Sequence, residues 1–108
     1  MIRSVTPLQA QELLADGSMD VVDVREAAEW SSGHLPGARN VPLEHLRADP
    51  KDALSRDGIL FVCSAGVRSQ TAARVAEASG MTRVFSLSGG TRSWVNAGLP
   101  LVHDVAAE

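Results

Sequence analysis

Short apolar segments alternate along this chain with segments of helical periodicity, and no other feature constrains its fold as strongly. Residues 20–24 (DVVDV) and 59–62 (ILFV) predict buried strands, whereas residues 7–15 and 68–79 predict helices. Helices that alternate with short buried strands are typical of crossover units around a mainly parallel sheet. The pattern therefore predicts a small open α/β domain with a sheet of about four or five strands.

The remaining segments fit the same alternation. Further strands are expected at residues 2–5, 38–41 and 83–87, and further helices near 25–30, 43–46, 49–54 and 91–97. With 108 residues and no internal repeat or linker, the chain has the size of one ordinary domain, residues 1–108. In open sheets of this kind, ligands bind outside the carboxyl ends of the strands. The residues that follow each strand are therefore the first candidates for a functional site.

The composition is that of a globular domain and argues against two kinds of partner. Hydrophobic residues make up 44% of the chain and charged residues 21%, and the net charge of -3 is spread over interleaved acids and bases. No basic stripe is present, so we expect no nucleic-acid partner. The first residues lack a signal-peptide pattern, and no apolar run approaches the roughly 20 residues that cross a bilayer. We expect a cytoplasmic protein without a membrane partner.

Cys63 is the only cysteine, and it stands at the carboxyl end of the strand predicted at residues 59–62. A single cysteine forms no disulfide within the chain and no cysteine cluster for zinc. The thiol is therefore either inert packing or a reactive group. Because free cysteines are often simply buried, the neighbouring residues have to decide between these interpretations.

The residues after Cys63 favour a reactive thiol. They form a segment that is predicted to run from strand end through a tight loop into a helix: Ser64, Ala65, Gly66, Val67, Arg68 and Ser69. The amino end of a helix carries unpaired N–H groups and a partial positive charge, which favour a thiolate. Arg68 is expected to add a cation, so that the pKa of Cys63 falls below its usual ~8.5. Gly66 lets the loop curl with its N–H groups inward, while Ser64 and Ser69 are expected to supply hydroxyl donors.

Four separated segments of the chain form a pattern: DVRE at 23–26 with Glu29 and Trp30, GHLPGA at 33–38 with NVP at 40–42, CSAGVRS at 63–69, and SGG at 88–90 with Trp94 and GLP at 98–100. In this order they resemble the signatures of the single-domain rhodanese family of thiosulfate or persulfide sulfurtransferases. Together they span nearly the whole chain. The resemblance implies a mainly parallel sheet of about five strands with helices on both faces.

The resemblance also implies a reaction. The Cys63 thiolate would attack a sulfane-sulfur donor, thiosulfate or a persulfide, and the resulting Cys63 persulfide would pass its outer sulfur to cyanide, a thiol or a protein acceptor. Cys63 is then the catalytic residue, and the loop residues Ser64, Ala65, Gly66, Val67, Arg68 and Ser69 bind the substrate. Neither a cofactor nor a metal is implied. Members efficient with thiosulfate often carry cations just after the cysteine, whereas Ser64 and Ala65 are neutral, which leaves the physiological donor open.

Two other functions remain as alternatives. Tyrosine phosphatases and arsenate reductases also use a cysteine at a strand end, a glycine-bearing loop and an arginine, but they place one residue more between cysteine and arginine. The shorter loop from Cys63 to Arg68 is expected to be cramped for phosphate, and no general-acid aspartate stands out. The second alternative is a non-catalytic interaction module, which the presence of Cys63, Gly66 and Arg68 disfavours.

The other notable polar and aromatic residues are assigned structural roles. Asp23, Arg25 and Glu29 are expected to form an ion-pair network that positions neighbouring loops, rather than to act in acid–base catalysis. His34 is expected to tie backbone segments together, since no other histidine stands at metal-ligand spacing from it. Packing at helix–sheet contacts is expected of both tryptophans, Trp30 and Trp94.

Overall fold

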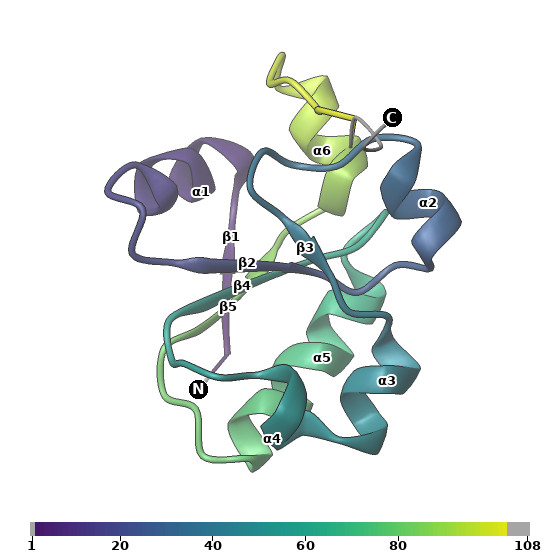
Figure 1. Cartoon of the computed structure of the whole chain (residues 1–108). Coiled ribbons are helices and arrows are strands. Elements are labelled where there is room, and N and C mark those ends of the chain that lie inside the picture. Colours follow the sequence, from purple (N-terminus) through teal and green to yellow (C-terminus); the bar gives the residue numbers. More distant parts are fainter. Residues whose placement is uncertain (1, 104–108) are drawn as a thin grey trace.

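A parallel five-stranded sheet forms the centre of the computed structural model, which describes residues 2–103 (Figure 1). Its strands are β1 (Arg3–Val5), β2 (Asp20–Asp23), β3 (Arg39–Asn40), β4 (Ile59–Val62) and β5 (Val84–Leu87). They lie in the order β1-β5-β4-β2-β3, and every neighbouring pair is parallel. The predicted α/β class and parallel sheet are confirmed.

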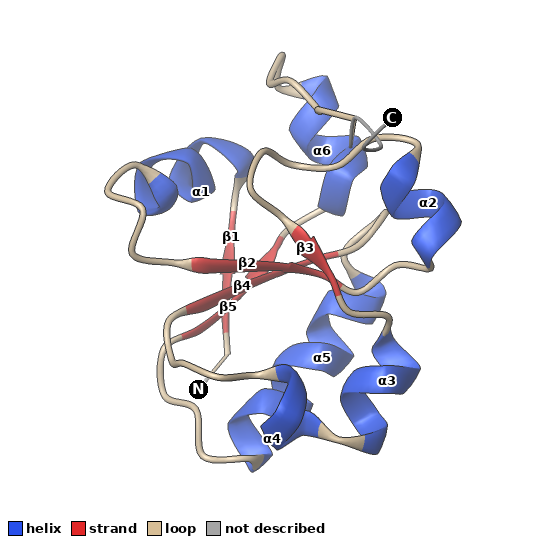
Figure 2. Ribbon diagram, in the orientation of Figure 1, coloured by secondary structure: helices blue, strands red, loops and turns tan. Residues whose placement is uncertain are grey.

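Helices cover both faces of this sheet, as expected. They are α1 (Pro7–Leu14), α2 (Ala27–Ser31), α3 (Leu43–Ala48), α4 (Pro50–Ala53), α5 (Val67–Ala78) and α6 (Gly90–Asn96). Figure 2 shows α1 and α6 on one side of the strands and α3, α4 and α5 on the other. The short helix α2 buries none of its residues, so it lies beside the core and contributes little to it.

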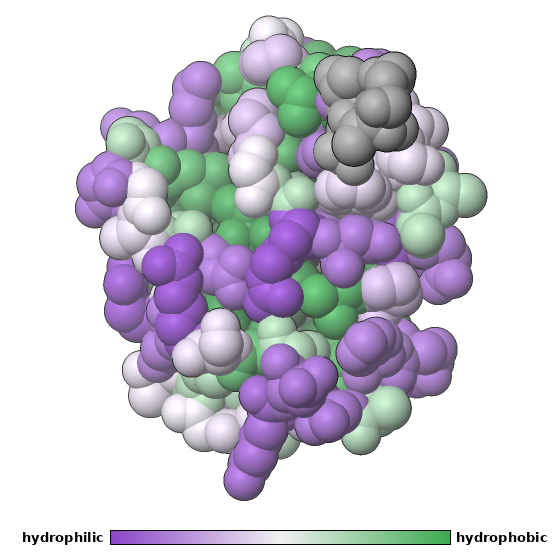
Figure 3. All heavy atoms as spheres, in the orientation of Figure 1, coloured by the Kyte–Doolittle hydropathy of each residue, from purple (hydrophilic) through white to green (hydrophobic). Residues whose placement is uncertain are grey.

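The side chains of β4 divide the core into two layers. Ile59 and Phe61 belong to the cluster that packs under α3, α4 and α5, whereas Leu60 and Val62 belong to the cluster under α1 and α6. All four are completely buried, because successive side chains of a strand point to opposite faces and this strand is covered on both. On the outside, the face seen in Figure 3 carries many hydrophilic side chains with apolar atoms between them.

Helix α5 packs on the sheet through small side chains. Ala72, Ala73 and Ala76 are completely buried in the same cluster as Ile59 and Phe61. Small side chains let a helix axis approach a sheet closely. This packing holds the amino end of α5 next to the carboxyl end of β4, which is where the chain places its cysteine.

Strand β3 is shorter than the segment predicted at residues 38–41. Its ladder to β2 contains only Arg39 and Asn40. The N–H of Ala38 instead donates to the carbonyl of Leu35 at 3.0 Å and belongs to a turn. Glycine and proline before this segment favour that turn, and Pro42 has no N–H to extend the ladder. The other helices and strands agree with their predicted ends to within two residues.

The position of β4 decides which segments meet at the site. It pairs with β2 on one side and with β5 on the other. Because all strands are parallel, the residues that follow β2, β4 and β5 converge at one edge of the sheet. Within residues 2–103, no helix has both the length and the apolar character needed to cross a membrane.

Candidate active site

Cys63 lies directly after β4, at the centre of the edge where the carboxyl ends of the strands meet. Residues 63–69, here called the cysteine loop, turn away from β4 and enter α5 at Val67. Gly66 makes the turn at a φ of 96°, a left-handed conformation that glycine adopts without strain. A Cβ at this position would approach the backbone nitrogen of Gly89 to 3.0 Å. The structure thus places Cys63 and Gly66 where the sequence predicts them.

The Cys63 sulfur lies inside the cysteine loop and faces hydrogen-bond donors. Its Sγ accepts hydrogen bonds from the N–H of Gly66 at 3.1 Å and from the N–H of Ser69 at 3.4 Å. It also lies 3.6 Å from the hydroxyl oxygen of Ser69. Only 1% of Cys63 is exposed to solvent. Converging N–H groups of this kind form a cradle for a negatively charged atom.

These donors lower the pKa of Cys63. Burial is the largest single influence and raises the pKa, because it disfavours a charged sulfur. It is outweighed by hydrogen bonds from the N–H and the hydroxyl of Ser69 and from the N–H groups of Gly66 and Ala65. Each of these bonds is stronger to a thiolate than to a thiol. The net effect favours the thiolate, which is the nucleophilic form of cysteine.

Arg68 is bound to Glu29 rather than directed at the sulfur. Its Nη1 donates to Oε1 of Glu29 at 2.7 Å, and its Nη2 donates to Oε2 at 3.0 Å. The sequence predicts that the charge of Arg68 lowers the pKa of Cys63. In the structure the leading influences that lower it are the hydrogen bonds from the loop. The charge of Arg68 does interact with Cys63, but this interaction ranks behind those of Arg68 with Glu29.

The hydroxyl of Ser64 also binds Glu29, so the prediction that it faces the reactive atom is wrong. It donates to Oε2 of Glu29 at 3.3 Å and accepts from Nη2 of Arg68 at 3.1 Å. The N–H of Glu26 donates to Oε1 at 2.9 Å. The hydrogen bond from Arg68 is the largest of the influences that lower the pKa of Glu29 to about 2. Glu29 therefore connects α2 to both ends of the cysteine loop.

Replacing Glu29 by glutamine is expected to lower the free energy of unfolding by roughly 1 kcal/mol at neutral pH, the size usual for a partly exposed ion pair. A lowered pKa means that the carboxylate stabilises the fold fully above its ordinary value of 4.5 and loses this effect as the pH falls toward about 2. Urea unfolding of both proteins should therefore give differences that shrink across this window. A difference that stays constant down to the acid end would contradict the ion-pair assignment.

The side chains of the two remaining loop residues lie outside the site. Val67 is 74% exposed, and Ala65 is also exposed. The N–H of Ala65 contributes to the lowered pKa of Cys63. Their side chains point to solvent because the loop turns its N–H groups inward, as the sequence predicts.

Asp23 and Arg25 form a second, separate ion pair. Nη2 of Arg25 lies 2.7 Å from Oδ2 of Asp23, and both side chains are buried. The same Nη2 donates to the carbonyl of Gly33 at 2.7 Å. The predicted network thus consists of two pairs, one that ties the end of β2 to the turn at Gly33 and one between Glu29 and Arg68.

His34 connects backbone segments, as predicted. Its Nδ1 lies 2.8 Å from the carbonyl oxygen of Trp30, and its backbone forms an antiparallel bridge with Val102. Trp30 stacks on the His34 ring at 4.1 Å and is only half-buried, so its predicted packing on the sheet is wrong. The reason is that α2 lies beside the core, whereas Trp94 on α6 is 4% exposed and packs within it. Among residues 2–103, no group of His, Cys, Asp or Glu side chains is placed to hold a metal ion.

The first turn of α6 supports the cysteine loop. The N–H of Thr91 donates to the carbonyl of Cys63 at 2.8 Å, and the N–H of Arg92 donates to the carbonyl of Ser64 at 3.1 Å. Gly90 permits this approach, because a Cβ there would lie 2.2 Å from the carbonyl oxygen of Cys63. No local pattern in the sequence reveals these contacts, since they join segments that are far apart along the chain.

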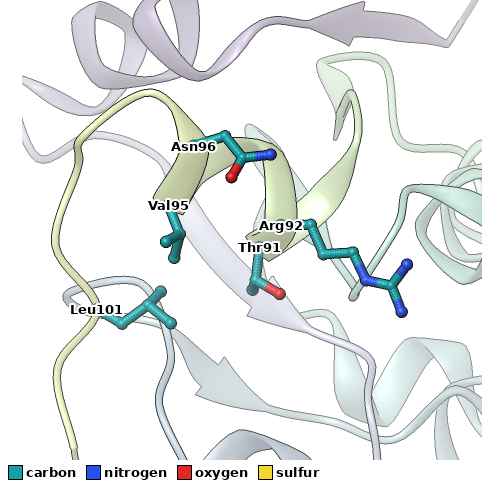
Figure 4. A pocket seen from close by; sticks show the side chains of 5 residues that line it. All are labelled: Thr91, Arg92, Val95, Asn96 and Leu101. Carbon is teal, nitrogen blue, oxygen red and sulfur yellow. The ribbon is translucent and has the colours of Figure 1, made fainter.

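A pocket of about 410 Å³ begins at the same turn and follows α6 (Figure 4). It is lined by Thr91, Arg92, Val95, Asn96 and Leu101. Arg92 is exposed, and no carboxylate among residues 2–103 pairs with its guanidinium. With Arg68 bound to Glu29, Arg92 is a cation beside the cysteine loop that is available to an anionic ligand.

Comparisons with known proteins agree with this fold. The rhodanese-like domain model matches residues 6–97. The thiosulfate sulfurtransferase GlpE of Ectopseudomonas mendocina is 33% identical over 92 residues, which cover 85% of this chain and 84% of GlpE. The putative sulfur carrier protein YrkF of Bacillus subtilis is 32% identical over 84 residues, 78% of this chain, and the match spans only 45% of YrkF. The crystal structure of a rhodanese-related protein from Thermoplasma volcanium is 30% identical with a TM-score of 0.83, covering 94% of this chain and 99% of that one. The chain therefore belongs to the family of rhodanese-like domains.

Proposed function

We propose that this chain is a sulfurtransferase that carries a sulfane sulfur as a persulfide on Cys63. The observation that carries the proposal is the position of Sγ, which accepts hydrogen bonds from the N–H groups of Gly66 and Ser69 inside the cysteine loop. The lowered pKa of Cys63 supports it, because the thiolate is the attacking form. The similarity to a thiosulfate sulfurtransferase and to a putative sulfur carrier supports the same reaction class.

In the loading step, the Cys63 thiolate attacks the outer sulfur of thiosulfate or of an organic persulfide. A bond forms between Sγ and this sulfur while the donor's own sulfur–sulfur bond breaks, and the electron pair of that bond leaves with sulfite or with a thiolate. The product is a Cys63 persulfide whose terminal sulfur is negatively charged. We expect the N–H groups of the cysteine loop to stabilise this charge.

In the discharge step, cyanide or a thiolate attacks the terminal sulfur of the persulfide. The bond between the two sulfurs breaks, its electron pair returns to Sγ, and the product leaves as thiocyanate or as a new persulfide. The Cys63 thiolate is restored. The two steps balance in atoms and electrons, so the reaction needs no cofactor and no external oxidant or reductant.

The ion pair of Arg68 disfavours the phosphatase alternative. An arginine that binds phosphate uses both terminal nitrogens for the oxygens of its ligand. Both terminal nitrogens of Arg68 donate to Glu29 instead. The hydrogen bonds of the loop converge on a single sulfur atom. This arrangement fits a persulfide better than a phosphate, whose negative charge is spread over several oxygens. A non-catalytic interaction module would not need a thiol whose pKa is lowered.

Arg92 is expected to attract anionic donors to the mouth of the cysteine loop. Replacing it by glutamine should raise the KM for thiosulfate roughly fivefold, which corresponds to about 1 kcal/mol. The value of kcat should change little, because Arg92 binds substrate and transition state alike. Steady-state kinetics at two salt concentrations would check this, since added salt screens the attraction and should reduce the difference.

The matched control is Arg74→Gln, which removes the same charge from an exposed position on α5. We expect its KM to stay at the wild-type value. An equal rise in KM for the two variants would show an effect of net charge and would contradict a local role of Arg92.

Intact-protein mass after incubation with a donor tests the proposed function directly. We expect the protein to gain the mass of one sulfur atom with thiosulfate and to lose it when cyanide or a reducing thiol is added. Because a sulfurtransferase can prefer an organic donor, the measurement is repeated with glutathione persulfide. Absence of a gain with both donors would overturn the proposal.

A further inference from the structure

Two buried serine hydroxyls lie behind the Cys63 sulfur. Oγ of Ser69 lies 3.6 Å from Sγ of Cys63 and 2.8 Å from Oγ of Ser86. Ser69 and Ser86 are completely buried, and Cys63 is 1% exposed. The three side chains therefore form a short hydrogen-bonded series, from Ser86 through Ser69 to the sulfur, that water does not interrupt. We call Ser69 and Ser86 the serine pair.

Ser86 occupies a position that the fold would otherwise fill with an apolar side chain. It lies in β5, in which every residue is buried, and its strand is paired on both sides, with Ser4 of β1 and Phe61 of β4 opposite it. A hydroxyl in such a place costs free energy unless it is hydrogen-bonded. Its partner in the structure is Ser69. The hydrogen bond to the Ser69 hydroxyl therefore best explains why a serine occupies this position.

The hydrogen bonds of the serine pair can run in either of two directions, because each hydroxyl has one proton to donate and can also accept a hydrogen bond. When Cys63 is a neutral thiol, its S–H donates to Ser69, and Ser69 donates to Ser86. When Cys63 is a thiolate, Ser69 donates to the sulfur, and Ser86 donates to Ser69. Ionisation therefore reverses both hydrogen bonds, while the thiol proton goes to solvent and each hydroxyl proton stays on its own serine.

The second direction depends on Ser86. A hydroxyl that donates to an anion becomes a stronger donor when its own oxygen accepts a hydrogen bond, since linked hydrogen bonds polarise one another in a low-dielectric interior. Ser86 lies within hydrogen-bond distance of Ser69 and is closed off from solvent. Without the Ser86 hydroxyl, the Ser69 hydroxyl would donate to the thiolate but would accept no hydrogen bond from Ser86.

We propose that Ser86 is a positioning residue that acts on Cys63 through Ser69: its hydroxyl holds the Ser69 hydroxyl toward Sγ whenever this sulfur is anionic. Ser86 does not touch the sulfur. The part of the inference that concerns catalysis rests on the proposed sulfurtransferase function, because the thiolate is both the attacking group of loading and the leaving group of discharge. The part that concerns the ionisation of Cys63 does not depend on that function.

The test is the pH dependence of Cys63 alkylation by iodoacetamide in a matched pair of variants, Ser86→Thr and Ser86→Val. Threonine and valine have nearly the same shape, so both variants place the same extra volume in the core, and only threonine keeps a hydroxyl. Cys63 is the only thiol in the chain, so alkylation reports on it alone. We expect the valine variant to shift the midpoint of alkylation upward by roughly half a pH unit relative to the threonine variant, about a threefold loss of thiolate at lower pH.

A control and a double substitution separate this role from general packing. Ser79→Ala removes a hydroxyl that donates to the carbonyl of Val75 at the far end of α5, and its alkylation midpoint should equal the wild type's. Ser86→Ala should shift the midpoint in the wild type but add nothing once Ser69 is already alanine, because Ser86 acts through Ser69. Equal midpoints for the threonine and valine variants would overturn the proposal, as would an undiminished Ser86→Ala shift in the Ser69→Ala background.

The same variants distinguish failure of this inference from failure of the proposed function. If Cys63 gains no sulfur from either donor but its alkylation midpoint shifts as described, the sulfurtransferase assignment is wrong and the role of Ser86 stands. If Cys63 is loaded normally and the midpoint does not move, the function stands and the role of Ser86 is wrong. If the proposed function and the role of Ser86 both hold, the valine variant should have a lower kcat/KM than the threonine variant at a pH below the midpoint of alkylation. Above the midpoint, the kcat/KM values of the two variants should converge.

Discussion

Cys63→Ser is expected to abolish sulfur transfer, with a fall in turnover of at least about 10⁴-fold, as is typical when a covalent nucleophile is removed. A serine hydroxyl has a much higher pKa than a thiol, so it supplies almost no anion at neutral pH, and it cannot form a persulfide. The substitution is nearly isosteric, and the serine oxygen can still accept from the N–H groups of Gly66 and Ser69 that bind Sγ. The effect should therefore fall on the reaction and leave the fold in place.

Thiocyanate production from thiosulfate and cyanide, together with the intact mass after loading, checks this expectation. A urea unfolding midpoint close to that of the wild type is the control that the variant is folded. Turnover that survives in a folded Cys63→Ser protein would show that the sulfur is carried elsewhere, and would remove the basis of the mechanism.

Gly90→Ala is expected to have the largest effect on stability of any glycine substitution at the site. Gly90 has a φ of 61°, and a Cβ on it would lie 2.2 Å from the carbonyl oxygen of Cys63 and 2.5 Å from the carbonyl group of Ser64. These are backbone atoms, so no side chain can rotate to make room. The cysteine loop would have to move, and the hydrogen bond from Thr91 to Cys63 would be lost. We expect a fall in the free energy of unfolding of about 3 kcal/mol or more, and with it the loss of sulfur loading.

Gly80→Ala is the matched control, because Gly80 also has a positive φ, 99°, but a Cβ there would have no atom within 4 Å. Its cost should be only that of placing alanine in a left-handed conformation, about 1 to 2 kcal/mol. Chemical unfolding of the two variants would separate backbone strain, which both share, from the contact with the cysteine loop. Equal costs would show that Gly90 is needed only for its conformation.

The elements that sequence predicts well are those whose cause is local. The apolar run Ile59–Val62 forms β4, and the alanines of residues 68–79 form the buried face of α5. The cysteine and glycine between them predict a tight loop in front of a helix, and the structure contains one. Hydrophobic periodicity and turn chemistry act over a few residues, so they are readable without knowledge of the sheet order.

The predictions that fail concern contacts between segments. Ser64 faces Glu29 and not the sulfur, and Trp30 stacks on His34 outside the core. No local pattern marks Ser86, because a serine within a strand of apolar residues carries no sequence signal of function. Each of these outcomes depends on which strands are neighbours, and the order β1-β5-β4-β2-β3 is a property of the folded chain.

Local sequence patterns are sufficient to predict a parallel α/β domain that presents one cysteine at the end of its central strand, because burial of apolar strands and the conformational freedom of glycine are local effects. The surroundings of that cysteine follow from the folded arrangement of the strands. With β4 between β2 and β5, Glu29 from beyond β2 takes up the charge of Arg68, and Ser86 from β5 reaches Ser69 behind the sulfur. Local patterns do not predict these contacts, because hydrogen bonds and ion pairs act over a few ångströms in space, whatever the distance along the chain.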